Sequence, residues 1–126
     1  MRLLLDTHII LWWLAGSREL GQRARALITA SDADLAVSVA SWWEVGIKRA
    51  LNRLEFDWQT GRRLLAANKI ATVQVTLDHA EAAAALPLYH GDPFDRMLVA
   101  QATVEGMQLL TRDRKLKVYG GSVLHV

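Results

Sequence analysis

Four carboxylate residues stand where an alternating α/β chain would place its chemistry. Asp6 directly follows the first apolar run, and Asp113 follows a later run by two residues. Glu44 and Asp95 each fall in the first turn of a predicted helix, where negative charge is favoured. Four converging carboxylates repel one another unless cations are bound, and oxygen-only ligands favour Mg²⁺ or Mn²⁺. The matching chemistry is attack on a phosphodiester by a metal-activated water.

Composition narrows the alternatives for metal chemistry and for substrate. There is no cysteine, so disulfides and thiolate metal sites are excluded, and the four histidines show no zinc-binding spacing. The chain has 15 basic and 13 acidic residues, a net charge of +2. If four of the acids sit in one cation-binding cleft, the remaining surface is clearly basic. Such a surface suits a polyanionic substrate.

The elements that must position these acids alternate between strand-like and helix-like segments. Consecutive apolar residues predict buried strands, and apolar residues three or four apart predict amphipathic helices. The predicted strands are 2–5, 35–39, 72–76, 107–111 and 123–126, and the predicted helices are 9–15, 19–30, 41–51, 58–68, 78–86 and 93–105. Asp78 is a candidate N-cap, and Gly106 a candidate helix end. This order predicts one α/β domain over residues 1–126, with a mainly parallel sheet that binds ligands at its carboxyl edge.

The N-terminal run MRLLLDTHIILWWLAG needs a separate interpretation, because Arg2 followed by apolar residues is also typical of a secretion signal. Asp6 and His8 interrupt the run, and it is too short to span a bilayer. We interpret it as a buried strand followed by a helix, and we expect a cytoplasmic protein that does not associate with membranes.

Each acid also has a purely structural interpretation. Asp6 could cap the helix that follows it, and Asp113 could cap the turn formed by RDRKLK. Glu44 and Lys48 are four residues apart, in the favourable order for a surface ion pair worth about 0.3 kcal/mol. No single acid therefore indicates a site, and only their joint placement does.

Four segments in order make the chain recognisable: LLLDTHIILWWLAG, SVASWWEVGIK, HGDPFDRMLVAQA, and LLTRD with a closing YGGSVLHV. Over essentially the whole chain they resemble PIN-domain proteins of the VapC toxin type. The resemblance implies a three-layer α/β/α fold and endoribonuclease activity dependent on Mg²⁺ or Mn²⁺. It also implies an antitoxin protein as partner.

The same resemblance assigns residues to the site. The family's four acidic positions are matched by Asp6, Glu44, Asp95 and Asp113. The acids expected to hold metal are Asp6, Asp95 and Asp113. Thr7 and Thr111 match hydroxyl residues near the acids and are expected to orient ligands or water. Asp92 lies three residues before Asp95, and we assign Asp92 to the helix cap because the family's acid immediately precedes the apolar helix.

Basic side chains near the acids are candidates for substrate contacts. Arg112 and its neighbours Arg114, Lys115 and Lys117 surround Asp113. They either hold RNA phosphates or form a solvated face. Arg96 follows a site acid and is expected to contact substrate or a neighbouring carboxylate.

Two pairs of tryptophans, Trp12–Trp13 and Trp42–Trp43, stand on predicted helices, where adjacent residues point about 100° apart. One member of each pair is expected to face the core and the other the surface. The helix over residues 9–14 is apolar all round and needs cover on more than one side. This indicates a homodimer interface or a groove for a partner helix. Full burial under neighbouring helices is the alternative.

Two other functions compete with the ribonuclease. In a haloacid-dehalogenase-like phosphatase the nucleophilic Asp also follows the first strand, but that family needs a second Asp two residues later, where this chain has His8. A non-catalytic RNA-binding or regulatory module would bind RNA with strong salt dependence and never cut it.

Overall fold

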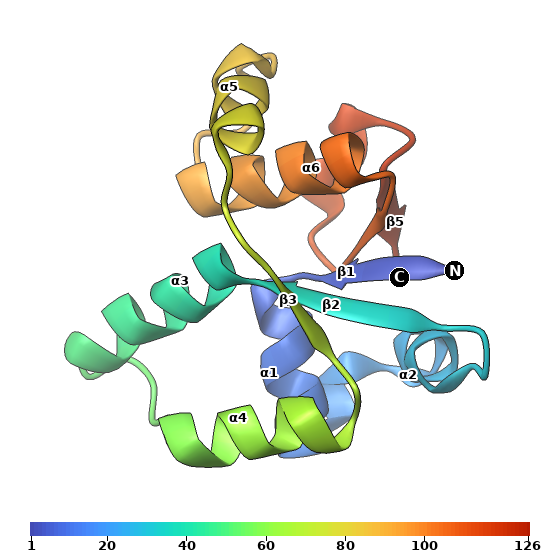
Figure 1. Ribbon diagram of the computed structural model, residues 1–126, viewed down its shortest axis with the longest axis vertical. Helices are drawn as coiled ribbons and strands as arrows, with labels where there is room; N and C mark the ends of the chain where they lie inside the picture. The colour runs from blue at the N-terminus through green and yellow to red at the C-terminus, as the bar shows by residue number, and fades with distance from the viewer.

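Five parallel strands form the sheet at the centre of the molecule in the computed structural model, which describes all 126 residues (Figure 1). The strands are β1 (Arg2–Leu5), β2 (Asp34–Ser38), β3 (Ala71–Val73), β4 (Gln108–Thr111) and β5 (Val123–His125). The helices are α1 (Thr7–Ala15), α2 (Gln22–Thr29), α3 (Val39–Ala50), α4 (Trp58–Ala67), α5 (Leu77–Ala85) and α6 (Pro93–Glu105). Two short 3-10 helices are η1 (Arg18–Leu20) and η2 (Arg114–Tyr119).

The strand order is β3-β2-β1-β4-β5, and every neighbouring pair is parallel. At the centre, Leu4 of β1 is paired with Ala36 of β2 and with Leu109 of β4. The predicted α/β class and parallel sheet are therefore confirmed. Because the strands are parallel, their carboxyl ends lie at one edge of the sheet.

Alternation along β1 divides the core between the two faces of the sheet. Leu3 and Leu5 belong to a cluster with residues of α1, α2 and α4, whereas Leu4 belongs to a second cluster with residues of α6. Figure 1 shows α1, α2 and α4 on one side of the sheet and α6 on the other, with α5 beyond α6. This is the three-layer α/β/α arrangement. None of the helices has both the length and the hydropathy that crossing a bilayer requires.

Several predicted element boundaries are confirmed by their capping residues. Asp92 is the N-cap of α6, Pro93 is its first residue, and Gly106 ends it in the left-handed conformation. The single helix predicted over 19–30 is wrong, because η1 ends at Leu20, α2 begins at Gln22, and Gly21 separates them. Gly21 has φ +81°, a positive value that glycine adopts readily and that a right-handed α-helix cannot contain.

Two predicted helix positions also need correction. Helix α3 begins at Val39, capped by the Ser38 hydroxyl, so Glu44 lies in its second turn and not in its first. Helix α5 is capped by Thr76, whose hydroxyl accepts from the backbone N–H of His79, and not by Asp78. In both cases a hydroxyl residue earlier in the chain takes the capping position, and the helix starts sooner than its apolar pattern indicates.

The two tryptophan pairs behave differently. Trp43 has 66% of its surface exposed and Trp42 packs among aromatic rings, so the prediction of one inward and one outward residue is confirmed for this pair. It is wrong for Trp12 and Trp13, which are both half-buried with an arginine guanidinium over each ring. The all-round apolar α1 is thus only partly covered by the rest of the chain, and its residues Leu11 to Leu14 stay half-buried.

Candidate active site

Asp6 lies directly beyond β1 at the carboxyl edge of the sheet and is 4% exposed. Its backbone N–H donates to the carbonyl of Leu110 at 3.0 Å, which continues the sheet ladder one residue past the strand. Its side chain makes no capping hydrogen bond to α1 and instead accepts from the Thr111 hydroxyl at 2.6 Å. Burial raises the pKa of Asp6; the Thr111 hydrogen bond opposes this and the charge of Glu44 adds to it.

Glu44 is also buried, and it faces the same edge from the second turn of α3. Its Oε1 accepts from the Thr7 hydroxyl at 2.7 Å, and its Oε2 lies 3.1 Å from the Lys48 ammonium. The ion pair predicted with Lys48 is therefore present, but it occupies only one carboxylate oxygen. Since Thr7 directly follows Asp6, the other oxygen is held beside the first site acid.

Asp92 and Asp95 have different roles at the start of α6. Asp92 Oδ1 accepts from the backbone N–H groups of Phe94 and Asp95, at 2.8 and 3.1 Å. It is therefore the cap, as predicted. Asp95 directs Oδ2 to His90 Nε2 at 2.8 Å. Burial raises the pKa of Asp95 to about 6; the His90 hydrogen bond opposes this, and the charges of Asp6 and Asp92 add to it.

Asp113 follows β4 and is tied to Asp6 through Thr111. The backbone N–H of Asp113 donates to the Thr111 hydroxyl at 3.0 Å, and that hydroxyl donates to Asp6. Asp113 Oδ1 also accepts from the backbone N–H of Lys115 at 3.0 Å, so it caps η2 as one interpretation predicted. Capping uses one oxygen and leaves the second for the site.

One donor atom each from His90, Asp95 and Asp113 lies within 4.8 Å of the other two. Carboxylate oxygens suit Mg²⁺ or Mn²⁺, and an imidazole nitrogen is compatible with the later first-row ions. The raised pKa values of Asp6 and Asp95 indicate carboxylates whose ionised forms lack compensation from the protein alone. A bound cation would supply that compensation, so the donor set fits the metal that the sequence predicts.

His90 is the residue that the sequence argument missed. It precedes the DPFD segment by two residues, and the turn made by Gly91 and the Asp92 cap brings its ring back over Asp95. The sequence does contain a signal, a histidine five residues before a site acid. That spacing corresponds to no regular element, so only the loop conformation reveals it.

Two predicted substrate contacts are engaged elsewhere. Arg96 donates to the carbonyls of Ala83, Leu86 and Pro87, so it closes the C-terminal end of α5 and touches no site carboxylate. Arg112 donates to the carbonyl of Glu19, and its guanidinium lies over the Trp12 ring. Neither guanidinium contacts a site carboxylate, because nearby carbonyls compete for these long side chains, and contact with substrate stays a prediction.

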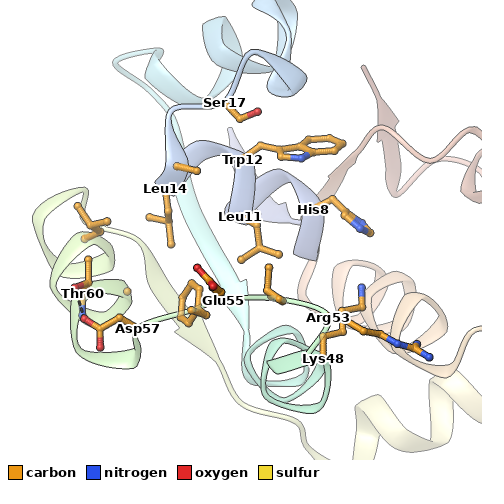
Figure 2. A pocket seen from close by; sticks show the side chains of 15 residues that line it. His8, Leu11, Trp12, Leu14, Ser17, Lys48, Arg53, Glu55, Asp57 and Thr60 are labelled. Carbon is orange, nitrogen blue, oxygen red and sulfur yellow. Dashed lines mark hydrogen bonds between the residues drawn. The ribbon is translucent and has the colours of Figure 1, made fainter. Parts of the chain in front are cut away.

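A groove of about 680 Å³ runs from α1 to α4 and the segment before it. Figure 2 shows Leu11 and Leu14 of α1 directed into it, with His8, Lys48 and Arg53 together at one end. Lys48 is also the ion-pair partner of Glu44. The basic end of the groove therefore adjoins the carboxylate cluster.

The pKa of Asp95 predicts how the stability of the metal-free protein depends on pH. Its folded value is about 6 and its ordinary value is 3.8, so between these values the folded state binds more protons. The free energy of unfolding should therefore fall as pH rises from 4 to 6.5 in EDTA. Asp95→Asn removes this contribution. The melting temperature of the variant should therefore rise by a few degrees relative to that of wild type as pH increases from 4 to 6.5.

Thermal unfolding of both proteins at each pH measures this difference. Asp34→Asn alters an exposed carboxylate on β2. Its melting temperature should depend on pH in the same way as that of wild type. If Asp95→Asn is less stable than wild type by the same margin at every pH, Asp95 is only a helix-terminal residue.

Comparisons with known proteins agree with this geometry. The sequence profile of the PIN domain matches residues 3–121. Ribonuclease VapC22 of Mycobacterium tuberculosis (strain ATCC 25618 / H37Rv) is 35% identical over 116 residues, which are 90% of this chain and 88% of that protein. These two matches confirm the resemblance drawn from the sequence.

Two solved structures share the fold. A toxin–antitoxin complex from Klebsiella pneumoniae contains a chain with a TM-score of 0.67 and 24% identity, covering 96% of this chain and 94% of that one. VapBC2 from Rickettsia felis, bound to a DNA fragment from its promoter, has a TM-score of 0.70 and 15% identity, covering 100% and 98%. With the parallel sheet, the carboxylates at its carboxyl edge and the profile match over nearly the whole chain, this protein belongs to the PIN domain family.

Proposed function

We propose that the protein is a metal-dependent endoribonuclease and the toxin of a type II toxin–antitoxin system, acting in the cytoplasm. The observation that carries the proposal is the convergence of Asp6, Glu44, Asp95 and Asp113 on one sheet edge, where burial raises the pKa values of Asp6 and Asp95 and neighbouring carboxylates add to both shifts. The 35% identical relative is a ribonuclease by name, and the similar structure from Klebsiella pneumoniae is a toxin–antitoxin complex by title.

In this proposal Asp6, Asp95 and Asp113 hold Mg²⁺ or Mn²⁺. When bound, such an ion lowers the pKa of a coordinated water and polarises the scissile phosphate. Thr111 orients Asp6 and Asp113 together, because its hydroxyl contacts both. Thr7 and Lys48 each hold one oxygen of Glu44, which fixes that carboxylate toward the attacking water.

The basic residues of η2 are the proposed contacts for RNA phosphates. Arg114, Lys115 and Lys117 are exposed beside Asp113, and no salt bridge engages them. Arg112 is excluded from this set by its contacts with Glu19 and Trp12. Phosphate contacts of this kind position the strand and carry no sequence information.

The groove along α1 is the proposed docking surface for the antitoxin. Its wall carries apolar side chains such as Leu11 and Leu14, and its basic end carries Lys48 and Arg53. This chemistry fits an amphipathic helix with an acidic residue near one end. Because Lys48 also holds Glu44, a helix seated there would lie against the carboxylate cluster and block RNA.

The apolar face between α3 and α6 is the proposed interface with a second copy of the chain in a homodimer. Trp43 of α3 and Phe94 of α6 make an edge-to-face contact at 5.4 Å on this face. Val39, Ile47 and Val75 extend it, and all three are exposed. A tryptophan that is 66% exposed within an apolar patch is characteristic of an interface between proteins.

Cleavage of RNA by the purified protein tests the proposed activity. We expect internal cuts in the presence of Mg²⁺ or Mn²⁺, no cuts in EDTA, and recovery when the ion is restored. Addition of the cognate antitoxin should block the cuts. Salt-sensitive RNA binding with no cleavage under any metal would instead favour the non-catalytic module.

A further inference from the structure

The loop between α5 and α6 holds His90 in a fixed position. The backbone N–H of His90 donates to the Tyr119 hydroxyl at 3.2 Å, and that hydroxyl donates to the carbonyl of Pro87 at 3.1 Å. Arg96 donates to the same carbonyl at 2.9 Å and lies 3.3 Å from the Tyr119 hydroxyl. Hydrogen bonds from Tyr119 of η2 and Arg96 of α6 thus hold the loop in place, and the imidazole of His90 lies over the site.

The imidazole occupies a position that a metal ligand would take. His90 Nε2 lies 2.8 Å from Asp95 Oδ2, and both side chains are only 17% exposed. Two donors on adjacent corners of an octahedron, each about 2.1 Å from the ion, are about 3 Å apart. One oxygen of Asp113 completes the group within 4.8 Å, whereas Asp6 lies outside it.

We propose that His90 is a nitrogen ligand of the divalent ion, alongside Asp95 and Asp113. This inference rests on the proposed metal-dependent function and adds a nitrogen donor to the carboxylates proposed to hold the ion. An imidazole changes the selectivity of the site, because Mg²⁺ prefers oxygen donors whereas nitrogen donors strengthen binding of later first-row ions. The site should therefore bind Mn²⁺ more tightly than Mg²⁺ by a margin that depends on His90.

The alternative role for His90 is a hydrogen bond to Asp95 alone. His90→Gln separates the two, since glutamine places an amide N–H near the position of Nε2 and can keep that hydrogen bond. His8→Gln is the matched control, because His8 is the other histidine whose charge acts on a site acid.

Two measurements on metal-loaded protein test the ligand. Pulsed electron paramagnetic resonance on bound Mn²⁺ should reveal a coordinated ¹⁴N in wild type and in His8→Gln, and none in His90→Gln. Calorimetric titration should show Mn²⁺ affinity falling at least about tenfold in His90→Gln, because loss of even an outer-sphere partner costs about 10- to 100-fold. Mg²⁺ affinity should fall by less, so the preference for Mn²⁺ should narrow.

Asp95→Asn distinguishes failure of this inference from failure of the proposed function. Suppose that Asp95→Asn weakens the binding of both ions, whereas His90→Gln keeps the ¹⁴N signal and the preference for Mn²⁺. The proposed metal site is then supported, and His90 is not a ligand. A ¹⁴N signal lost in His8→Gln would overturn the assignment to His90. Unchanged Mn²⁺ binding by Asp95→Asn would overturn the proposed metal site, and His90 with it.

Discussion

Asp6→Asn and Asp95→Asn should each lower the rate of RNA cleavage by about a thousandfold or more while the protein stays folded. The expected loss reflects several kcal/mol of charge stabilisation at the attacking water and the scissile phosphate, and about 1.4 kcal/mol corresponds to each factor of ten. In Asp6→Asn the amide oxygen can still accept from Thr111, which preserves the link between β1 and β4. Cleavage of a labelled RNA at saturating Mn²⁺, with circular dichroism for the fold, measures both parts.

Asp92→Asn is the matched control for these variants. It changes the same functional group three residues from Asp95, but Asp92 caps α6, and asparagine caps as well as aspartate. Its cleavage rate should stay close to that of wild type. Robust cleavage by Asp6→Asn, or a loss in Asp92→Asn as large as in Asp95→Asn, would contradict the assignment of the site.

Trp43→Glu should convert the protein from a dimer to a monomer at micromolar concentration. In a two-fold dimer the same patch faces its own copy, so the variant would bring two buried carboxylates toward each other. Truncating a central tryptophan in an interface costs about 2–4 kcal/mol, which raises the dissociation constant about thirtyfold or more. Light scattering across a dilution series measures the change.

The control for assembly is Leu51→Glu, which places the same charge on an exposed leucine at the C-terminal end of α3, away from Phe94 and Val75. It should remain dimeric. Wild-type protein that is monomeric at every working concentration would contradict the proposed dimer, and so would a Trp43→Glu variant that stays dimeric.

The sequence by itself determined the sheet, the main helices and the edge where the acids gather. Consecutive leucines in β1 can be buried only if both faces of the strand are covered, and helices alternating with strands along the chain supply that cover in a parallel sheet. The Asp92–Pro93 start and the Gly106 end of α6 follow from backbone conformation and capping over a few residues. Asp6 follows β1 and Asp113 follows β4 by two residues, so parallel strands place both at one edge of the sheet, whereas the pairing of β1 with β4 was decided by the tertiary structure.

Only the tertiary structure decided which partners the side chains around the acids find. Thr111 joins Asp6 to Asp113, and His90 returns over Asp95, because the ends of β1 and β4 and the α5–α6 loop are packed together. Arg96 and Arg112, beside site acids in sequence, turn to carbonyls of α5 and η1. The physical reason is the difference in sequence range between the interactions that set the backbone and those that set the side chains. Backbone conformation is selected by interactions within a few residues, whereas a long side chain has many rotamers, and the selected one depends on acceptors brought near by distant parts of the chain.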